Sequence, residues 1–227
     1  MSAAAVAPRL ADRLVAAVAL VVLSPLLAVA GLGIKLSSRG PVLYAAPRVG
    51  LHGQAFTMYK LRTMRLSTGE RARLTSGSDP RVFPWGAALR RLKIDELPQL
   101  VNIVRGEMAI VGPRPEDPAI VSSGYAEWMM ETLSVSPGLT SPGSLDYFAE
   151  ERDLPDDPET LEAIYLKRLL PKKLAADVVY VRNRNLAYDV QLVMRTLLSL
   201  VGLRSAFADA RASERREAAA LLARVGS

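Results

Sequence analysis

Two adjacent acidic residues, Asp95 and Glu96, are the side chains in this sequence whose type and spacing best suit chemistry. They open the stretch Asp95-Glu96-Leu97-Pro98-Gln99-Leu100, which is typical of a helix start, because Asp is a favoured N-cap and Pro is tolerated in a first turn. The unpaired N–H groups and dipole of such a terminus attract phosphate. The carboxylates can therefore attack a bound phosphoryl group or hold Mg²⁺, or they can form an ordinary helix cap.

An arginine between two prolines favours the phosphate interpretation. In Gly112-Pro113-Arg114-Pro115, the prolines restrict the backbone of Arg114 to an extended geometry. A guanidinium on a preset backbone suits bidentate recognition of phosphate, although it can equally pair with a carboxylate. We expect further positive charge from a lysine and two arginines that can also serve as ordinary ion-pair partners: Lys60, Arg62 and Arg90.

The composition excludes several kinds of chemistry. The chain has 227 residues, half of them hydrophobic, which suits one compact domain with an appendage or two small domains. It has no Cys, which excludes disulfides, thiolate nucleophiles and cysteine metal sites, and its single His, His52, excludes multi-histidine metal sites. The 29 basic and 23 acidic residues give a net charge of +6, which favours nucleic acid, phosphorylated substrates or anionic lipid as partners.

An uncharged apolar segment, residues 14–34, lies near the N-terminus. As a helix it would be about 32 Å long, close to the thickness of a bilayer's hydrocarbon core. Four interpretations compete: a buried core helix, a cleaved signal peptide with Ala28-Val29-Ala30 as its cleavage site, a simple spanning helix, and a hairpin that re-enters the same leaflet.

Two local features favour the re-entrant hairpin. Ser24-Pro25 lies in the middle of the segment; Pro25 cannot donate to the carbonyl of Val21, and the Ser24 hydroxyl can satisfy a freed carbonyl. Basic residues flank both ends, and by the positive-inside rule both ends prefer the cytoplasm, which a spanning helix would not allow. The flanking residues are Arg9, Arg13, Lys35 and Arg39.

The remaining residues predict an α+β fold that is mainly helical. Two β-leaning runs, 42–44 and 55–59, flank Gly50-Leu51-His52-Gly53, which predicts a small β-hairpin. Apolar periodicity predicts helices at 85–92, 95–105, 125–133, 161–170, 173–181 and 186–203, with a cationic amphipathic helix at 213–225. We therefore expect a membrane helix-break-helix hairpin at 1–39, a cytosolic globular domain with amphipathic interfacial helices at 40–205, and a C-terminal tail helix at 206–227.

An ordered series of motifs over residues 9–148 resembles the monotopic phosphoglycosyl transferases, the bacterial sugar transferase family. The matching pieces are Arg9-Leu-Ala-Asp12, Ser24-Pro25, Gly40-Pro41-Val42, Arg48-Val-Gly50, Lys60-Leu-Arg62-Thr63-Met64, Asp79-Pro80-Arg81, Leu89-Arg90-Arg91, Asp95-Glu96-Leu97-Pro98-Gln99-Leu100, Asn102, Gly106-Glu107-Met108, Val111-Gly112-Pro113-Arg114-Pro115 and Pro137-Gly138-Leu139-Thr140. The chain resembles the small form, which consists of the catalytic unit alone.

The resemblance implies a reaction and a site. A UDP-sugar gives its phosphosugar to polyprenyl phosphate and UMP leaves, with Asp95 as the nucleophile that carries the phosphosugar and Glu96 assisting with Mg²⁺ or proton handling. Arg114, Arg90, Lys60 and Arg62 would hold phosphates, and Ser24-Pro25 would mark the membrane bend. The implied partners are the UDP-sugar, polyprenyl phosphate and anionic lipid, without nucleic acid, at the cytoplasmic face of the bacterial inner membrane. The alternative is a catalytically inactive scaffold that binds lipid phosphate.

Overall fold

The computed structural model describes residues 10–66, 79–152, 155, 157–200, 202–203 and 208–225. Arg9, one of the flanking basic residues, lies outside these ranges. In chain order, the helices and strands are α1 (Leu10–Ser37), β1 (Leu43–Val49), η1 (Leu51–Gly53), β2 (Ala55–Leu61), α2 (Pro84–Arg91), η2 (Ile94–Glu96), α3 (Gln99–Arg105), β3 (Ala109–Val111), α4 (Pro118–Gly124), η3 (Glu127–Ser134), β4 (Gly138–Thr140), α5 (Pro142–Arg152), α6 (Pro158–Ile164), η4 (Tyr165–Leu169), α7 (Leu170–Asn183), α8 (Leu186–Leu200) and α9 (Ala208–Val225).

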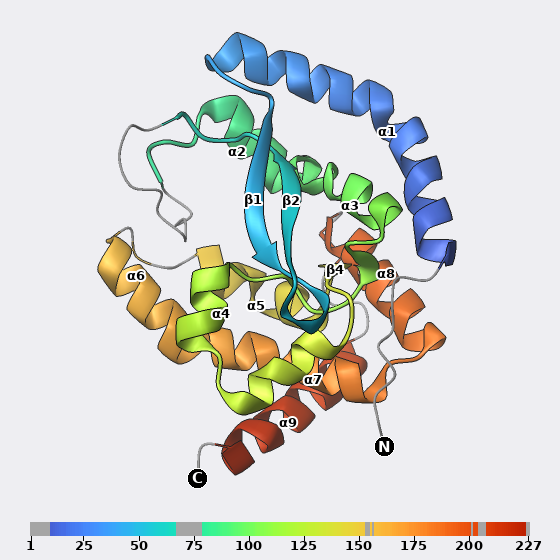
Figure 1. The fold of residues 1–227 in the computed structure, drawn as a ribbon, viewed down its shortest axis with the longest axis vertical. Helices are drawn as coiled ribbons and strands as arrows, with labels where there is room; N and C mark the ends of the chain where they lie inside the picture. Colours follow the sequence, from blue (N-terminus) through green and yellow to red (C-terminus); the bar gives the residue numbers. More distant parts are fainter. Residues whose placement is uncertain are drawn as a thin grey trace.

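The predicted β-hairpin is confirmed and stands at the centre of the molecule (Figure 1). β1 pairs antiparallel with β2 from Leu43 opposite Leu61 to Val49 opposite Ala55. The hairpin packs on α3, and Asn102 fixes this contact: its Oδ1 accepts from the Tyr59 N–H at 3.1 Å, and its Nδ2 donates to the Thr57 carbonyl at 2.7 Å.

α1 is one continuous helix, so the break that we expected in the apolar segment is absent. The Ser24 hydroxyl donates to the Val21 carbonyl at 2.8 Å, the carbonyl that Pro25 cannot pair with, and the helix continues through the proline. Figure 1 shows α1 changing direction along its length and following the outside of the domain. Pro25 is a known cause of such a bend.

The two halves of α1 pack on different hydrophobic clusters. Ala16 belongs to a cluster with the β-hairpin and α3, whereas Ala30 and Ile34 belong to a second cluster with β2 and α2. The opposite face is exposed, and its large apolar side chains include Leu14, Val18, Val21, Val22, Val29 and Leu32. The bent helix is therefore bound to the domain along one side and presents an apolar surface on the other.

A second, smaller sheet positions the arginine between the prolines. β3 runs parallel to β4, with Ala109 opposite Gly138. The backbones approach closely just after β3, where a Cβ on Gly138 would overlap the backbone of Gly112. This contact fixes the chain immediately before Pro113 and Arg114.

The C-terminal tail helix packs on the domain instead of standing free. α9 lies against α7, where Ala218 is buried among Ala175, Ala176 and Val179. α5 begins at Pro142 and carries Asp146, which faces both α8 and α9. This helix therefore joins the C-terminal elements to the rest of the domain.

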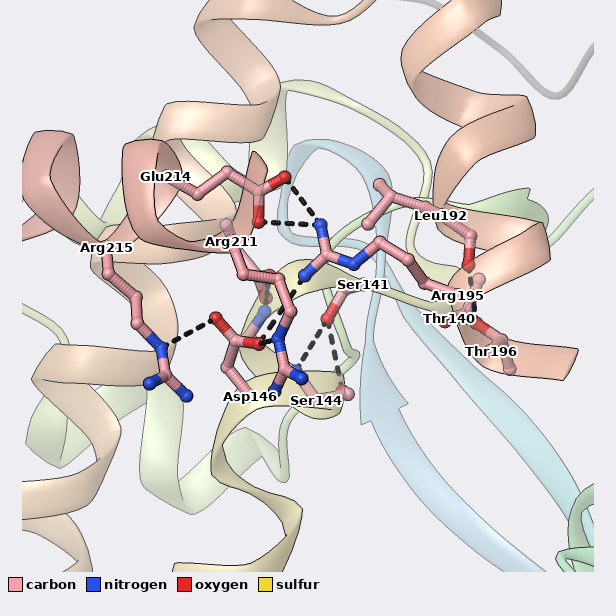
Figure 2. Close-up of polar contacts among 12 residues, drawn as sticks. Thr140, Ser141, Ser144, Asp146, Leu192, Arg195, Thr196, Arg211, Glu214 and Arg215 are labelled. Atoms are coloured by element: carbon pink, nitrogen blue, oxygen red, sulfur yellow. Dashed lines mark hydrogen bonds and ion pairs between the residues drawn. The ribbon is translucent and has the colours of Figure 1, made fainter. Parts of the chain in front are cut away.

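A buried network of charges holds α9 in place (Figure 2). The Arg195 guanidinium of α8 donates to Glu214 of α9 at 2.6 and 2.8 Å and lies 3.4 Å from Asp146. Asp146 also accepts from Arg211 at 2.9 Å and from Arg215 at 3.2 Å. Because a buried charge must be paired, α9 completes the environment of Arg195.

Replacing Glu214 by Gln is expected to lower the free energy of unfolding by about 3 kcal/mol, because it removes the nearer of the two charged partners of buried Arg195. The matched control is Glu131→Gln, which breaks the more exposed pair with Arg182 and should cost about 0.5 kcal/mol. Thermal unfolding of the purified variants measures both. Equal, small effects from the two substitutions would contradict the structural role of the network.

Candidate active site

The η2 turn, Ile94–Glu96, presents the acidic pair. Lys93 precedes it with φ 58, a left-handed conformation that turns the chain sharply into η2. Our prediction that Asp95 caps a helix is wrong: α3 begins at Gln99 after Pro98 as its N-cap, so the pair lies in a separate short turn. Pro98 lacks an N–H and serves well at this boundary.

Asp95 is nine-tenths buried and carries an oxygen that is ready for a ligand. Within the described part of the chain, its Oδ1 has no hydrogen-bond partner. Burial, and next the charge of Glu96, raise the pKa of Asp95, while Lys60, Lys93 and Arg90 oppose that rise. The carboxylate is thus poorly solvated, which is the state of a reactive nucleophile.

Glu96, in contrast, is surrounded by cations. Its Oε1 lies 2.8 Å from Arg114 Nη2 and 3.6 Å from the Nζ atoms of both Lys60 and Lys93. Burial alone would raise the pKa of Glu96, but Arg114, Lys93 and Lys60 together outweigh it and hold that pKa well below its usual range. Glu96 therefore stays ionised and gathers positive charge beside Asp95.

Arg114 reaches the pair from the other side of the site, and four groups fix it. Besides Glu96, its guanidinium donates to Gln99 Oε1 at 3.0 Å and to the Leu139 carbonyl at 3.2 Å. Its backbone N–H faces Asp177 Oδ2 at 3.4 Å. The side chain is thus held by η2, α3 and β4 at once, and the backbone by α7.

Lys60 and Arg90 complete the cationic group. Burial lowers the pKa of Lys60 to about 8, against the opposing effect of Glu96. Arg90, from α2, donates through Nε to Thr63 Oγ1 at 2.8 Å, and its charge acts on Asp95. The structure thereby brings together four of the predicted site residues around Asp95: Glu96, Arg114, Lys60 and Arg90.

Arg62 does not join them, although the resemblance implied a phosphate-binding role. Its guanidinium donates to the Pro41 carbonyl at 2.6 Å, to the Ser38 hydroxyl at 2.8 Å and to the Ser38 carbonyl at 2.9 Å. The side chain is buried and lies over the Phe83 ring. Arg62 thus fastens the end of α1 to β2, and these contacts occupy most of its donors.

The acidic pair offers two carboxylates for a metal ion, and no group of three or more His, Cys, Asp or Glu side chains suited to one occurs among the described residues. Mg²⁺ commonly binds one or two carboxylates together with substrate phosphates. The buried Oδ1 of Asp95 fits that pattern, because it is an oxygen ligand that no described side chain or backbone group pairs with. Asp95 and Glu96 are therefore the residues that would hold Mg²⁺ together with a phosphorylated substrate.

The comparison with known proteins decides the family. Residues 3–203 match the sequence profile described as "Bacterial sugar transferase". The chain belongs to this family. Our prediction of the family is therefore confirmed, and the C-terminal helix α9 lies beyond the matched residues of this bacterial sugar transferase.

Several curated relatives match most of the chain. It is 37% identical over 195 residues to "Undecaprenyl-phosphate glucose phosphotransferase" of Komagataeibacter xylinus, covering 83% of this chain and 34% of that protein. It is 37% identical over 203 residues to "UDP-glucose:undecaprenyl-phosphate glucose-1-phosphate transferase" of Caulobacter vibrioides, covering 88% and 71%. It is 32% identical over 195 residues to "UDP-N-acetylgalactosamine-undecaprenyl-phosphate N-acetylgalactosaminephosphotransferase" of Aeromonas hydrophila, covering 84% and 42%.

Sequence reasoning missed three residues of this bacterial sugar transferase that shape the site. Lys93 and Gln99 contact Glu96 and Arg114, and neither belongs to a pattern that predicts such a contact. Asp177 had a usable signal, because it is an acid within the apolar run of a predicted helix. It is buried, accepts from the Gly143 N–H at 2.9 Å, and joins α7 to the segment that carries Arg114.

The burial of Asp177 predicts a pH dependence of stability. Burial raises the pKa of Asp177 to about 6, so the folded chain keeps a proton that the unfolded chain releases near 3.8. Stability from this group is present at low pH and falls as the pH rises to 6, by about 3 kcal/mol in total. We expect Asp177→Asn to remove this fall in thermal melts between pH 4 and 7. If the melting temperatures of the wild type and of Asp177→Asn changed in parallel with pH, that result would contradict the prediction.

Proposed function

We propose that the chain transfers a phosphosugar from a UDP-sugar to polyprenyl phosphate and releases UMP. The observation that carries the proposal is the buried carboxylate oxygen of Asp95, which has no hydrogen-bond partner among the described residues and lies beside a carboxylate that gathers three cations. The names of the relatives, which describe transfer of glucose phosphate or N-acetylgalactosamine phosphate to undecaprenyl phosphate, support the same reaction. The chain spans 34% and 71% of the first two of these relatives, so its activity is inferred from the shared region.

In the proposed first step, a carboxylate oxygen of Asp95 attacks the β-phosphorus of the UDP-sugar. The bond between that phosphorus and the bridging oxygen breaks, its electron pair stays with the oxygen, and UMP leaves. The product is an acyl phosphate in which the phosphosugar is bound to Asp95. Since this carboxylate is ionised when it attacks, the step requires no proton transfer.

In the second step, a phosphate oxygen of polyprenyl phosphate attacks the same phosphorus and displaces the Asp95 carboxylate. The product is polyprenyl-diphosphate-sugar, and the enzyme is restored. Arg114, Lys60 and Arg90 stabilise the negative charge that develops on the phosphoryl oxygens in both steps. Bound Mg²⁺ would supply further neutralisation of the diphosphate. Glu96 keeps Arg114 and Lys60 in place.

Turnover of a panel of UDP-sugars tests this proposal. We expect purified chain with Mg²⁺ and polyprenyl phosphate to release UMP, and the relatives' names make UDP-glucose and UDP-N-acetylgalactosamine the first substrates to try. A folded chain that releases no UMP from any UDP-sugar would contradict the proposal and favour the inactive lipid-binding scaffold.

We also propose that α1 places the domain on the cytoplasmic face of the bacterial inner membrane as a re-entrant segment. Among the described helices, α1 is long and apolar enough to cross a membrane, and its outward face is exposed. The change of direction along α1, which contains Pro25, and the basic residues on both flanks support entry and exit through one leaflet. The exposed apolar stripe of α8 suits an interfacial helix on anionic lipid; it consists of Leu186, Val190, Met194 and Leu197.

Labelling with thiol reagents tests the topology, and the absence of Cys makes the chain suitable without further change. Cysteines introduced singly by Ala3→Cys and Ser213→Cys are expected to react from the same side of sealed inverted membrane vesicles. The physical reason is that a re-entrant segment returns both flanks to the side with the basic residues. Reaction of the two positions from opposite sides would contradict the re-entrant arrangement.

A further inference from the structure

One hydrophobic cluster connects the C-terminal half of α1 to the turn that carries Asp95. Ala30 and Ile34 of α1 are buried together with Leu61, Phe83 and Leu89. Ile94, the residue before Asp95, packs against the same cluster. The side chains that hold the apolar helix therefore also hold η2.

Trp85, at the start of α2, packs against α1 beside this cluster. Its indole N–H donates to the Ala30 carbonyl at 3.2 Å, a second hydrogen bond for a carbonyl within the helix. A Cβ on Gly33 would overlap the indole ring, so the ring fits against the helix only because residue 33 is Gly. Trp85 is 37% exposed, with its apolar body on α1 and its polar atom paired.

The other side of α2 is fixed to the active site. A Cβ on Gly86 would overlap the Thr63 carbonyl, so α2 lies directly on the chain that follows β2. The Thr63 hydroxyl in turn accepts from Arg90 at 2.8 Å. α2 is thus held by α1 through Trp85 and by the active site through Thr63, and these two sets of contacts share no side chain.

We infer that Trp85, seated on Gly33, is a positioning residue that sets the height of Asp95 above the membrane and thereby governs transfer to the lipid acceptor. This inference rests on the proposed function. The UDP-sugar is soluble and can reach Asp95 at any height, whereas the phosphate of polyprenyl phosphate is confined to the level of the headgroups. Reacting atoms must approach within about 3–3.5 Å, and a displacement of about 1 Å can cost about 100-fold in rate. Disturbing the packing of Trp85 on α1 should therefore slow transfer from the adduct to polyprenyl phosphate, and it should leave the rate of adduct formation unchanged.

The substitution Gly33→Ala tests this directly, because it displaces the indole without weakening α1: Ala is favoured over Gly in a helix. We expect the covalent phosphosugar adduct to form from UDP-sugar within about twofold of the wild-type rate, whereas transfer from the adduct to polyprenyl phosphate in lipid vesicles should slow by about 100-fold. Transfer to a short-chain, water-soluble prenyl phosphate should stay near the wild-type rate. Gly124→Ala in α4, where the added Cβ would meet the flexible ends of Leu166 and Leu170, is the matched control and should leave both steps unchanged.

A second pair of variants separates positioning from general damage. In Gly33→Ala combined with Trp85→Leu, the overlap is gone, so the double variant should transfer to vesicles no more slowly than Trp85→Leu alone. Thr63→Val removes the acceptor of Arg90 and should instead slow adduct formation itself.

Two results would overturn the inference while leaving the proposed function intact. One is wild-type transfer by Gly33→Ala to the vesicle-bound acceptor, and the other is equal slowing of adduct formation and transfer. A wild-type chain that forms no adduct in the same assay would overturn the proposed function itself.

Discussion

Asp95→Asn is expected to lower the rate of phosphosugar transfer by about 10⁴-fold and to abolish the covalent adduct, since an amide oxygen cannot form the acyl phosphate. The variant should fold normally. Because burial raises the pKa of Asp95, the fold favours an uncharged side chain there, and Asn should leave thermal stability equal or higher. UMP release and intact-protein mass measure the two effects.

Asp117→Asn provides the matched control for this loss. Asp117 caps α4 by accepting from the Ala119 N–H at 2.9 Å, and Asn caps a helix as well as Asp does. We expect this variant to transfer at the wild-type rate. Turnover by Asp95→Asn within tenfold of the wild type would exclude Asp95 as the nucleophile.

Arg114→Lys is expected to lower kcat/KM by about 100- to 1000-fold although it keeps the charge. The guanidinium donates to Glu96, Gln99 and Leu139 at the same time, and an ammonium cannot reproduce that planar arrangement. The substitution therefore removes both the orientation of the cation toward phosphate and one clamp on Glu96. Steady-state kinetics with UDP-sugar as the varied substrate measures the loss.

Arg182→Lys is the corresponding control, because Arg182 pairs with Glu131 on η3, outside the cationic group around Glu96. It should change kcat/KM by less than about twofold. If Arg114→Lys behaves like Arg182→Lys, the guanidinium geometry has no part in catalysis, and charge alone accounts for the site.

The sequence was sufficient to predict the parts of this fold that depend on local pattern. Alternation and turn residues located the β-hairpin, and the uncharged run located α1. The restricted backbone of Arg114 indicated either phosphate binding or pairing with a carboxylate; the structure shows the pairing, with Arg114 Nη2 2.8 Å from Glu96 Oε1, and the phosphate role stays a prediction. In each case, the signal was contained within a few consecutive residues.

The features that sequence reasoning missed depend on tertiary contacts. Arg62 lies in the same motif as Lys60, and strand alternation would place both on one face. β2 ends at Leu61, however, and beyond that end Arg62 turns to the end of α1, where it donates to Ser38. The left-handed Lys93, which turns the chain from α2 into η2, has no sequence signature, since positive φ usually favours Gly or Asn. The packing of the Trp85 ring on Gly33 brings together residues far apart in the chain, and no local sequence pattern specifies this contact.

Locating the phosphosugar on the chain is the most direct test of the central claim. The wild-type chain should be mixed with UDP-sugar and Mg²⁺ without lipid acceptor, quenched in acid within milliseconds, digested and sequenced by mass spectrometry. The account predicts a hexose phosphate on the peptide that contains Asp95, at Asp95 itself, and its disappearance when polyprenyl phosphate is added before the quench. Catalytic turnover with no adduct on any time scale, or an adduct on another residue, would contradict it.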